Sequence, residues 1–247
     1  NIQFAIKDGQ LYVIEVNPRA SRTVPFVSKA TGVSLAKLAA KVMVGEKLKD
    51  LGYTETIIPT HFSVKEAVFP WNRFPGIDIV LGPEMKSTGE VMGIDADWGM
   101  AYAKSQISAF NPLPTEGNVF LSVADLDKDR AVAVARDLVE LGFKIYSTGG
   151  THARLVAEGI PSTRVYKVAE QARPNIVDRM KNKEIHFIIN TPASHESRAD
   201  EILIRSTAIA QKISHATNLS AAEASVKAMR SLKTREFTVK SIQEYHA

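Results

Sequence analysis

Cysteine is absent from this chain of 247 residues, which excludes a disulfide scaffold and a thiolate metal site. Long apolar runs are absent too, because no stretch approaches the roughly 18 residues that a membrane span needs. The first residues also lack the basic and then apolar pattern of a signal peptide. We therefore expect a cytoplasmic protein that has no membrane partner.

An excess of one charge is lacking as well. The formal net charge is only +4, and lysine and arginine are spread over both halves of the chain. A nucleic-acid-binding protein concentrates them on one face, so the sequence argues against DNA or RNA as a partner. The remaining composition, 45% apolar and 23% charged, is typical of a globular protein with one large or two modest domains.

The stretch from Glu15 to Arg22 carries the clearest chemical pattern. Residues 11–17 are rich in β-branched and aromatic side chains and predict a strand, on which Glu15 and Asn17 face the same side. A carboxylate and an amide oxygen are ligands that Mg²⁺ accepts, with substrate phosphates completing its shell. A proline then ends the strand, and Arg19 and Arg22 follow on a turn from which they can hold phosphate oxygens.

A preceding strand over residues 2–7 forms a hairpin with this one, and the register decides whether Gln3 joins Glu15 and Asn17. The Asp-Gly pair between the strands favours a two-residue turn, which puts Gln3 on the face opposite to Glu15. A three-residue loop instead places Gln3 directly across from Glu15. It also makes one apolar face from the pairs Ile2 and Val16, Phe4 and Ile14, and Ile6 and Tyr12.

We predict the three-residue loop, because burying several apolar side chains at roughly 1.5–3 kcal/mol each outweighs a turn preference of about 1 kcal/mol. Gln3, Glu15 and Asn17 then form one polar patch. The alternative is a solvated polar face on a half-buried hairpin without any ligand.

The rest of the chain reads as two domains. Residues 34–43 follow an apolar stripe typical of a packed helix, and residues 97–110 predict another helix. Two prolines and a glycine then give residues 111–117 the composition of a linker. The predicted domains are residues 1–110 and residues 118–247.

Strands and helices alternate from Asn118 onward, which predicts an α/β domain with a parallel sheet flanked by helices. Residues 147–151 lead from a strand through two glycines to a helix start, where bare backbone N–H groups and the helix dipole favour a phosphate. The hydroxyls of Thr148 and Thr151 add donors. Asn190 and Lys167 end two further strands, at the edge where α/β sheets bind ligands. A simple strand-to-helix connection is the alternative.

Three runs in the first domain resemble the ATP-grasp enzymes, and within them the end of the second ATP-grasp unit of carbamoyl phosphate synthetase large subunits. The runs are Gln3-Phe4-Ala5, Ile14-Glu15-Val16-Asn17-Pro18-Arg19-Ala20 and Arg22-Thr23-Val24-Pro25-Phe26-Val27-Ser28-Lys29-Ala30-Thr31-Gly32. The resemblance implies the C-terminal part of an ATP-grasp α+β domain. It also implies that Gln3, Glu15 and Asn17 bind Mg²⁺ or Mn²⁺ at the phosphates of ATP, and that Arg19 and Arg22 contact phosphate.

The second domain resembles the Rossmann-like, methylglyoxal-synthase-like domain that closes such a subunit and carries its allosteric site. Matched position by position, the residues on the effector-phosphate positions are Lys128, Thr148, Thr151, Lys167 and Asn190. The implied ligand is a nucleotide monophosphate, UMP or IMP. Pro192 departs from the pattern by removing a hydroxyl donor, and the usual ornithine contacts near His215 are not matched.

The resemblance covers the whole chain, which corresponds to the last quarter of a large subunit. It implies a part in making carbamoyl phosphate from bicarbonate, glutamine-derived ammonia and two ATP, at the step that phosphorylates carbamate. The implied partners are the small glutaminase subunit and the remainder of the large subunit, so we expect the chain alone to be inactive. The alternative function is methylglyoxal synthase, which eliminates phosphate from dihydroxyacetone phosphate and needs carboxylates to move protons.

Overall fold

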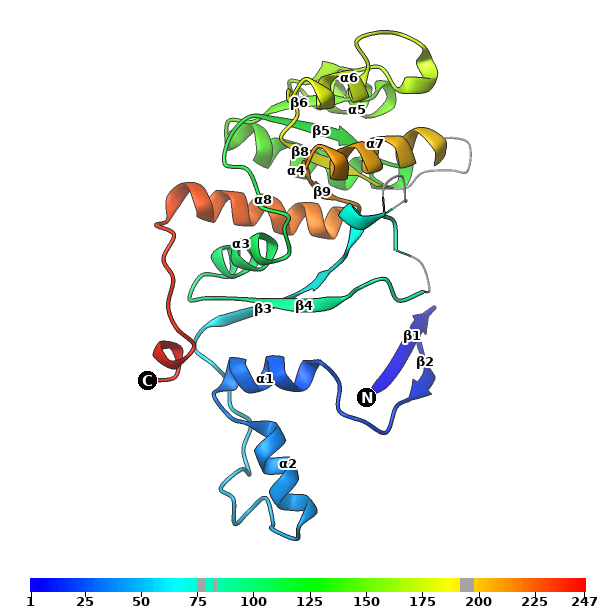
Figure 1. The fold of residues 1–247 in the computed structure, drawn as a ribbon. Helices are drawn as coiled ribbons and strands as arrows, with labels where there is room; N and C mark the ends of the chain where they lie inside the picture. Colours follow the sequence, from blue (N-terminus) through cyan, green and yellow to red (C-terminus); the bar gives the residue numbers. More distant parts are fainter. Residues whose placement is uncertain (75–78, 82–83, 192–197) are drawn as a thin grey trace. The chain divides into compact units, whose positions relative to one another are not determined.

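The computed structural model describes residues 1–74, 79–81, 84–191 and 198–247, so Pro192 lies outside the described residues (Figure 1). The chain forms two compact units. The first consists of residues 1–61 with 238–247, and the second of residues 62–237. Packing thus divides the chain before residue 62, because the elements between 62 and 110 join the second unit. The domain boundary predicted at residues 111–117 stays a prediction.

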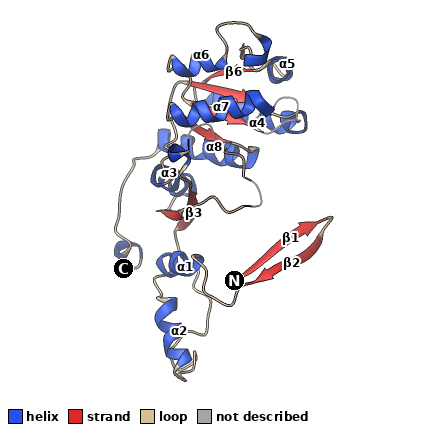
Figure 2. Cartoon of the chain, turned by 45° about the vertical axis from the view of Figure 1, so that its right-hand side comes forward, coloured by secondary structure: helices blue, strands red, loops and turns tan. Residues whose placement is uncertain are grey.

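The first unit contains one hairpin and a few helices (Figure 2). Its elements are β1 (Ile2–Lys7), β2 (Gln10–Val16), α1 (Thr23–Thr31), α2 (Leu35–Met43) and the 3₁₀ helix η5 (Gln243–Tyr245). The last residues of the chain close the end of α1. His246 Nε2 lies 2.7 Å from the carbonyl oxygen of Lys29, and His61 Nε2 lies 3.1 Å from that of Ala30. These imidazoles bond to carbonyls that a helix end leaves without partners inside the helix.

The hairpin register shows that the predicted three-residue loop is wrong, although its consequence for Gln3 is correct. Asp8 and Gly9 form a two-residue turn with φ of 51° and 77°, the left-handed pair that a type I′ turn requires. Phe4 therefore pairs with Val13, yet Gln3 pairs with Glu15, because β2 carries one extra residue between these pairs. This β-bulge shifts the register by one and satisfies both the turn and the polar patch.

The prediction of the longer loop relied on the free energy of burying apolar side chains, and this hairpin does not gain that energy. Every residue of β1 and β2 is exposed, including Ile6 at 75% and Ile14 at 63%, so no apolar face is buried. Helix α2 behaves likewise, since none of its residues is buried and its predicted packing stripe is half-buried at best.

The second unit begins with an antiparallel strand pair covered by a helix. Its elements are β3 (Phe62–Val68), η1 (Trp71–Arg73), β4 (Gly89–Asp95) and α3 (Trp98–Ser108). Asp97 caps α3, since its Oδ1 accepts a hydrogen bond from Met100 N at 3.0 Å. Gly93 lets the helix lie directly on β4, because a Cβ there would overlap the carbonyl of Ala101.

A five-stranded parallel sheet follows, in the order β7-β6-β5-β8-β9, which confirms the predicted α/β fold. The strands are β5 (Asn118–Ser122), β6 (Lys144–Ser147), β7 (Thr163–Arg164), β8 (Phe187–Asn190) and β9 (Ser214–Ala216). The helices are α4 (Lys128–Glu140), α5 (Gly149–Ala157), α6 (Ile176–Lys181), α7 (Arg198–Ala210) and α8 (Leu219–Thr234), with 3₁₀ turns η2 (Asp125–Asp127) and η3 (Val168–Glu170). Within the described residues, no helix is both long and apolar enough to cross a membrane.

Helices cover both faces of this sheet (Figure 1). Val119 and Leu121 pack with α4 and α8, whereas Phe120, between them, packs with α6 and α7. Because side chains alternate along a strand, the three central residues of β5 are all apolar, as expected of a strand buried on both faces. The carboxyl ends of the strands remain at one edge, next to the start of α5.

Residues 111–117 carry no helix or strand but are held in place by hydrogen bonds. Asn111 Nδ2 donates to Gln106 Oε1 at 2.7 Å, and Asn111 Oδ1 accepts from the backbone of His215 at 3.1 Å. Gln106 in turn donates to Glu66 Oε2 at 2.8 Å. Burial raises the pKa of the Glu66 carboxyl, with the bond from Gln106 opposing it, and burial lowers the pKa of His215.

Replacing Glu66 by glutamine should change how stability depends on pH. A carboxyl whose pKa is raised by folding contributes stability that is fully present below its unfolded value of 4.5 and is lost as pH rises through the folded value. The Glu66→Gln variant keeps an acceptor for Gln106 and never ionises, so this loss should disappear. Chemical denaturation at several pH values above 4.5 measures it. Parallel pH profiles of the two proteins would contradict the assignment.

Candidate functional site

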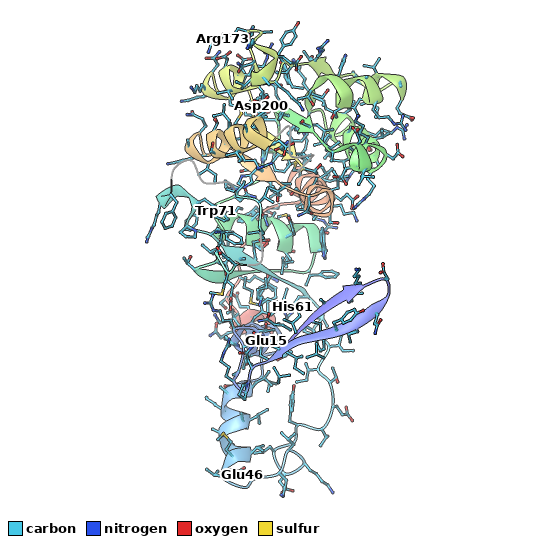
Figure 3. All side chains as sticks on the ribbon, turned by 90° about the vertical axis from the view of Figure 1, so that its right-hand side faces the viewer. Glu15, Glu46, His61, Trp71, Arg173 and Asp200 are labelled. Carbon is cyan, nitrogen blue, oxygen red and sulfur yellow. The ribbon has the colours of Figure 1, made fainter. Side chains whose placement is uncertain are left out.

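The three predicted metal ligands meet on the hairpin, where Glu15 is labelled in Figure 3. Glu15 Oε1 accepts hydrogen bonds from Gln3 Nε2 and from Asn17 Nδ2, each at 2.6 Å. Gln3 is the cross-strand neighbour of Glu15, and Asn17 follows Glu15 by two residues in the sequence. The bulge after Gln3 therefore produces a compact polar cluster on an exposed surface.

The donor set of this cluster fits a hard divalent cation. It offers one carboxylate and two carboxamides, and a half-turn of each carboxamide would replace its N–H₂ group by its oxygen. Among the described residues, no group of three or more His, Cys, Asp or Glu side chains could hold a metal ion. An ion here would thus depend on amide oxygens and on phosphate oxygens of a ligand.

Arg19 and Arg22 follow the cluster on an exposed turn. Arg19 N donates to the carbonyl of Asn17 at 2.8 Å, which keeps the turn tight behind the cluster. Arg22 is the N-cap residue of α1, whose first turn contains no acidic residue. Cationic side chains beside a helix start are a feature that binds phosphate, and at this start the N–H of Thr23 already donates to Ser21 Oγ at 3.2 Å.

A second cluster lies where β5 and β6 end. Thr148 precedes α5 but does not cap it, because its Oγ1 is bonded to Ser122 Oγ at 3.0 Å. Thr151 Oγ1 accepts from Val123 N at 3.3 Å. The first bond inside the helix runs from His152 N to the carbonyl of Thr148 at 2.8 Å, so the N–H groups of the two glycines and Thr151 have no partner within the helix.

Asn190 is fixed in a known orientation beside this cluster. Arg205 Nη1 donates to Asn190 Oδ1 at 2.9 Å, and Asn190 Nδ2 donates to the carbonyl of Ser122 at 3.2 Å. A guanidinium can only donate and a carbonyl can only accept, which assigns the two ends of the carboxamide. Asn190 is only 2% exposed, and its second N–H has no hydrogen-bond acceptor among the residues that the structure describes.

Of the two predicted lysines, Lys128 lies at this cluster and Lys167 is close enough for its charge to affect Asp125. Lys128 Nζ lies 2.6 Å from Asp125 Oδ1, and it lies 3.0 Å from the position that a Cβ of Gly150 would occupy. The hydrogen bond and charge of Lys128 lower the pKa of the Asp125 carboxyl, and the charge of Lys167 adds to this effect. Lys167 does not end strand β7 as predicted, since the strand stops at Arg164 and Lys167 instead precedes η3.

Three residues of this cluster had not been predicted from the sequence. Ser122 and Asp125 come from the end of β5 and the turn after it, and Arg205 comes from α7. Arg205 is paired with Glu201 at 3.5 Å, one helical turn earlier, and both side chains are buried. The i,i+4 spacing of Glu201 and Arg205 is visible in the sequence, but the same spacing is typical of an ordinary exposed ion pair on a helix and does not by itself indicate a buried one.

Comparison with known proteins identifies the family. The model described as "Carbamoyl-phosphate synthase L chain, ATP binding domain" matches residues 1–51, and the one described as "MGS-like domain" matches residues 130–217. The carbamoyl phosphate synthase large chain of Archaeoglobus fulgidus is 53% identical over the whole chain. Those of Gemmatimonas aurantiaca and Pseudomonas putida are 52% and 51% identical, also over 100% of this chain. The chain belongs to the carbamoyl phosphate synthase large-chain family.

The chain spans only part of these relatives, namely 23%, 22% and 23% of their lengths in the same order. The ATP-binding model includes the whole hairpin cluster and both arginines. The MGS-like model includes Thr148, Thr151, Lys167 and Asn190, but it begins two residues after Lys128. Both candidate sites therefore lie in regions that resemble the family, in agreement with the resemblance noted in the sequence.

Removing Arg205 should destabilise the protein strongly. The Arg205→Met variant leaves Glu201 as a buried carboxylate without its guanidinium, which costs about 3–5 kcal/mol of unfolding free energy. The matched control is Arg136→Met, because Arg136 forms an exposed pair with Glu158 at 2.9 Å and should lose less than about 1 kcal/mol. Denaturant titration measures both changes, and equal losses would show that Arg205 is no more than a surface ion pair.

Proposed function

We propose that this chain is the C-terminal region of a carbamoyl phosphate synthase large chain with two tasks. Its hairpin contributes metal and ATP-phosphate ligands for the phosphorylation of carbamate. Its parallel-sheet domain binds a regulatory nucleotide monophosphate, UMP or IMP. The observation that carries the proposal is the polar cluster at Glu15, in a chain that matches synthase large chains from end to end.

The hairpin residues have separate roles in this proposal. Glu15 supplies the negative charge for the cation, and Gln3 and Asn17 supply amide oxygens on either side of it. Mg²⁺ or Mn²⁺ bound there neutralises charge on the phosphates of ATP during transfer. Arg19 and Arg22 hold phosphate oxygens from the turn that follows. The remainder of the large chain and the small glutaminase subunit are the partners in this proposal, and the cytoplasm is its location.

The cluster at α5 supports the regulatory task by the number of donors that it directs at one place. Free N–H groups of the helix start, the hydroxyls of Thr148 and Thr151 and the spare N–H of Asn190 can all donate to phosphate oxygens. Lys128 and Lys167 add positive charge. The sheet holds these groups before a ligand arrives, which reduces the ordering that binding must supply.

Methylglyoxal synthase is the second candidate, because the same donors would hold the phosphate of dihydroxyacetone phosphate. That reaction needs a carboxylate that can take a proton. Asp178 is used as a helix cap, since its carboxylate accepts from Asn175 N at 3.0 Å. Asp125 stands at the cluster, but Lys128 lowers its pKa and thus weakens it as a base. The regulatory function is therefore favoured.

The hairpin proposal predicts a selective loss of activity in a full-length large chain. Glu15→Gln should abolish carbamate phosphorylation because it removes the charge that the metal needs. The change should leave thermal stability nearly unaltered, since Glu15 is exposed. A coupled ADP assay and a thermal melt measure the two effects.

The isolated chain of 247 residues gives a further control. It should turn over neither ATP nor carbamoyl phosphate in the same assay, because the proposal assigns the other parts of the nucleotide site to the remainder of the large chain. Steady metal-dependent turnover by this chain alone would overturn the proposal.

The regulatory proposal predicts that Lys167→Ala weakens UMP or IMP binding by roughly 10- to 100-fold, as expected for a lost charged hydrogen bond of about 1.5–3 kcal/mol. Calorimetry measures the affinity. The methylglyoxal alternative predicts instead that dihydroxyacetone phosphate is consumed and that Lys167→Ala slows its consumption. Methylglyoxal production without heat from either nucleotide would replace the regulatory assignment.

A further inference from the structure

A second cation, besides Lys128, lies against the start of α5. Arg164 ends strand β7, and its partner in the parallel register is Ser147 of β6. Its guanidinium lies close to Gly149, because a Cβ there would be 3.7 Å from Nε and 3.8 Å from Nη2. Lys128 holds the corresponding place at Gly150, at 3.0 Å.

The two cations stand on adjacent flanks of the helix start. In an α-helix each Cα–Cβ bond tilts toward the N-terminus, and consecutive side chains point about 100° apart around the axis. Groups at the Cβ positions of Gly149 and Gly150 therefore face the open N–H groups from two directions. One positive side chain thus lies beside each of the two glycines at the helix start.

Basic side chains beside a helix start favour the binding of an anion there. The N-terminus of a helix carries partial positive charge, which attracts acidic side chains and repels basic ones. The first turn of α5 contains no acidic residue, and its N-cap Thr148 makes no capping bond. Charge at the cluster is therefore balanced only by acids from elsewhere in the described chain.

Each cation has one such acid as a partner. Arg164 Nη2 lies 3.1 Å from Glu170 Oε2, and Lys128 lies 2.6 Å from Asp125. The other oxygen of Glu170 accepts from the backbone N of Lys167 at 2.9 Å, which anchors the acid beside the site. The Asp125 side chain is 92% exposed, so its hold on Lys128 is weakened by solvent. A dianion between the cations can replace both partners.

We infer that Arg164 is a further binding residue of this anion site. With Lys128 it forms a two-sided clamp that selects a phosphate monoester, which carries nearly two negative charges at neutral pH, over a phosphodiester, which carries one. This inference rests on the proposed nucleotide site and names the charge state that the site prefers. The ring of Tyr166, 5.3 Å from the guanidinium carbon, supports the clamp from behind.

The test compares UMP with cyclic UMP by calorimetry at pH 7.5, using the purified chain. Arg164→Leu should weaken UMP binding by roughly 10-fold and cyclic UMP binding by less than about 3-fold, so the preference for the monoester should shrink. The matched control is Arg154→Leu, at the far end of α5 from the helix start. Arg154 is paired with two acids, Asp129 at 3.1 Å and Glu158, and its loss should leave both affinities unchanged.

A second variant gives an effect of opposite sign. Glu170→Gln keeps an acceptor for the backbone of Lys167 but removes the acid that competes for Arg164, so UMP affinity should rise by roughly 2- to 5-fold. Equal UMP affinities for Arg164→Leu and Arg154→Leu, or weaker binding by Glu170→Gln, would overturn the clamp and leave the nucleotide site intact. Wild-type protein that binds neither UMP nor IMP would overturn the site and the clamp together.

Discussion

The edge of the parallel sheet depends on one buried charge, the guanidinium of Arg205. It donates to Asn190, Asn190 donates to the backbone of Ser122, and the Ser122 hydroxyl is bonded to Thr148. These bonds connect α7 to the start of α5 across two strands. A buried polar network of this kind is stable only when each member is satisfied, so a change at Arg205 is transmitted to Asn190 and Thr148 at the candidate site. The orientation of Asn190 is the clearest example.

Much of this domain is predictable because its signals are local. The apolar runs of β5 and β8 and the helices between them give the alternation from which the parallel sheet was predicted, and the structure confirms it. The Gly149-Gly150 pair after a strand marked a candidate anion site in the same way, and that site stays a prediction. Strand β9 was not predicted, because three residues are too few to show a period and their pairing with β8 is a long-range contact.

The hairpin shows where such reasoning fails. The polar patch of Gln3, Glu15 and Asn17 was predicted and is present, but the reason given for it was wrong. In a hairpin with a regular register, a two-residue type I′ turn would prevent Gln3 from pairing with Glu15. A bulge reconciles them, and no residue type in β2 marks its position. The apolar side chains of the hairpin also proved to be exposed. The periodicity of the sequence shows that one face of a strand is apolar, but it does not show whether another element covers that face.

The two glycines at the start of α5 were predicted to mark an anion site, but the usual reason for glycine at such a turn does not apply to them. Gly at such a turn is usually explained by a left-handed backbone, yet neither Gly149 nor Gly150 has positive φ. Their contribution is space: a Cβ at Gly150 would press on the ammonium of Lys128, and one at Gly149 would touch the guanidinium of Arg164. Only the contact at Gly150 is tight, at 3.0 Å, so it is Gly150 that leaves room for the ammonium of Lys128, whereas the 3.7 Å at Gly149 is an ordinary contact distance. The same sequence thus brings two positive charges close to a helix start, where Glu170 and Asp125 balance them and where an anionic ligand would be attracted.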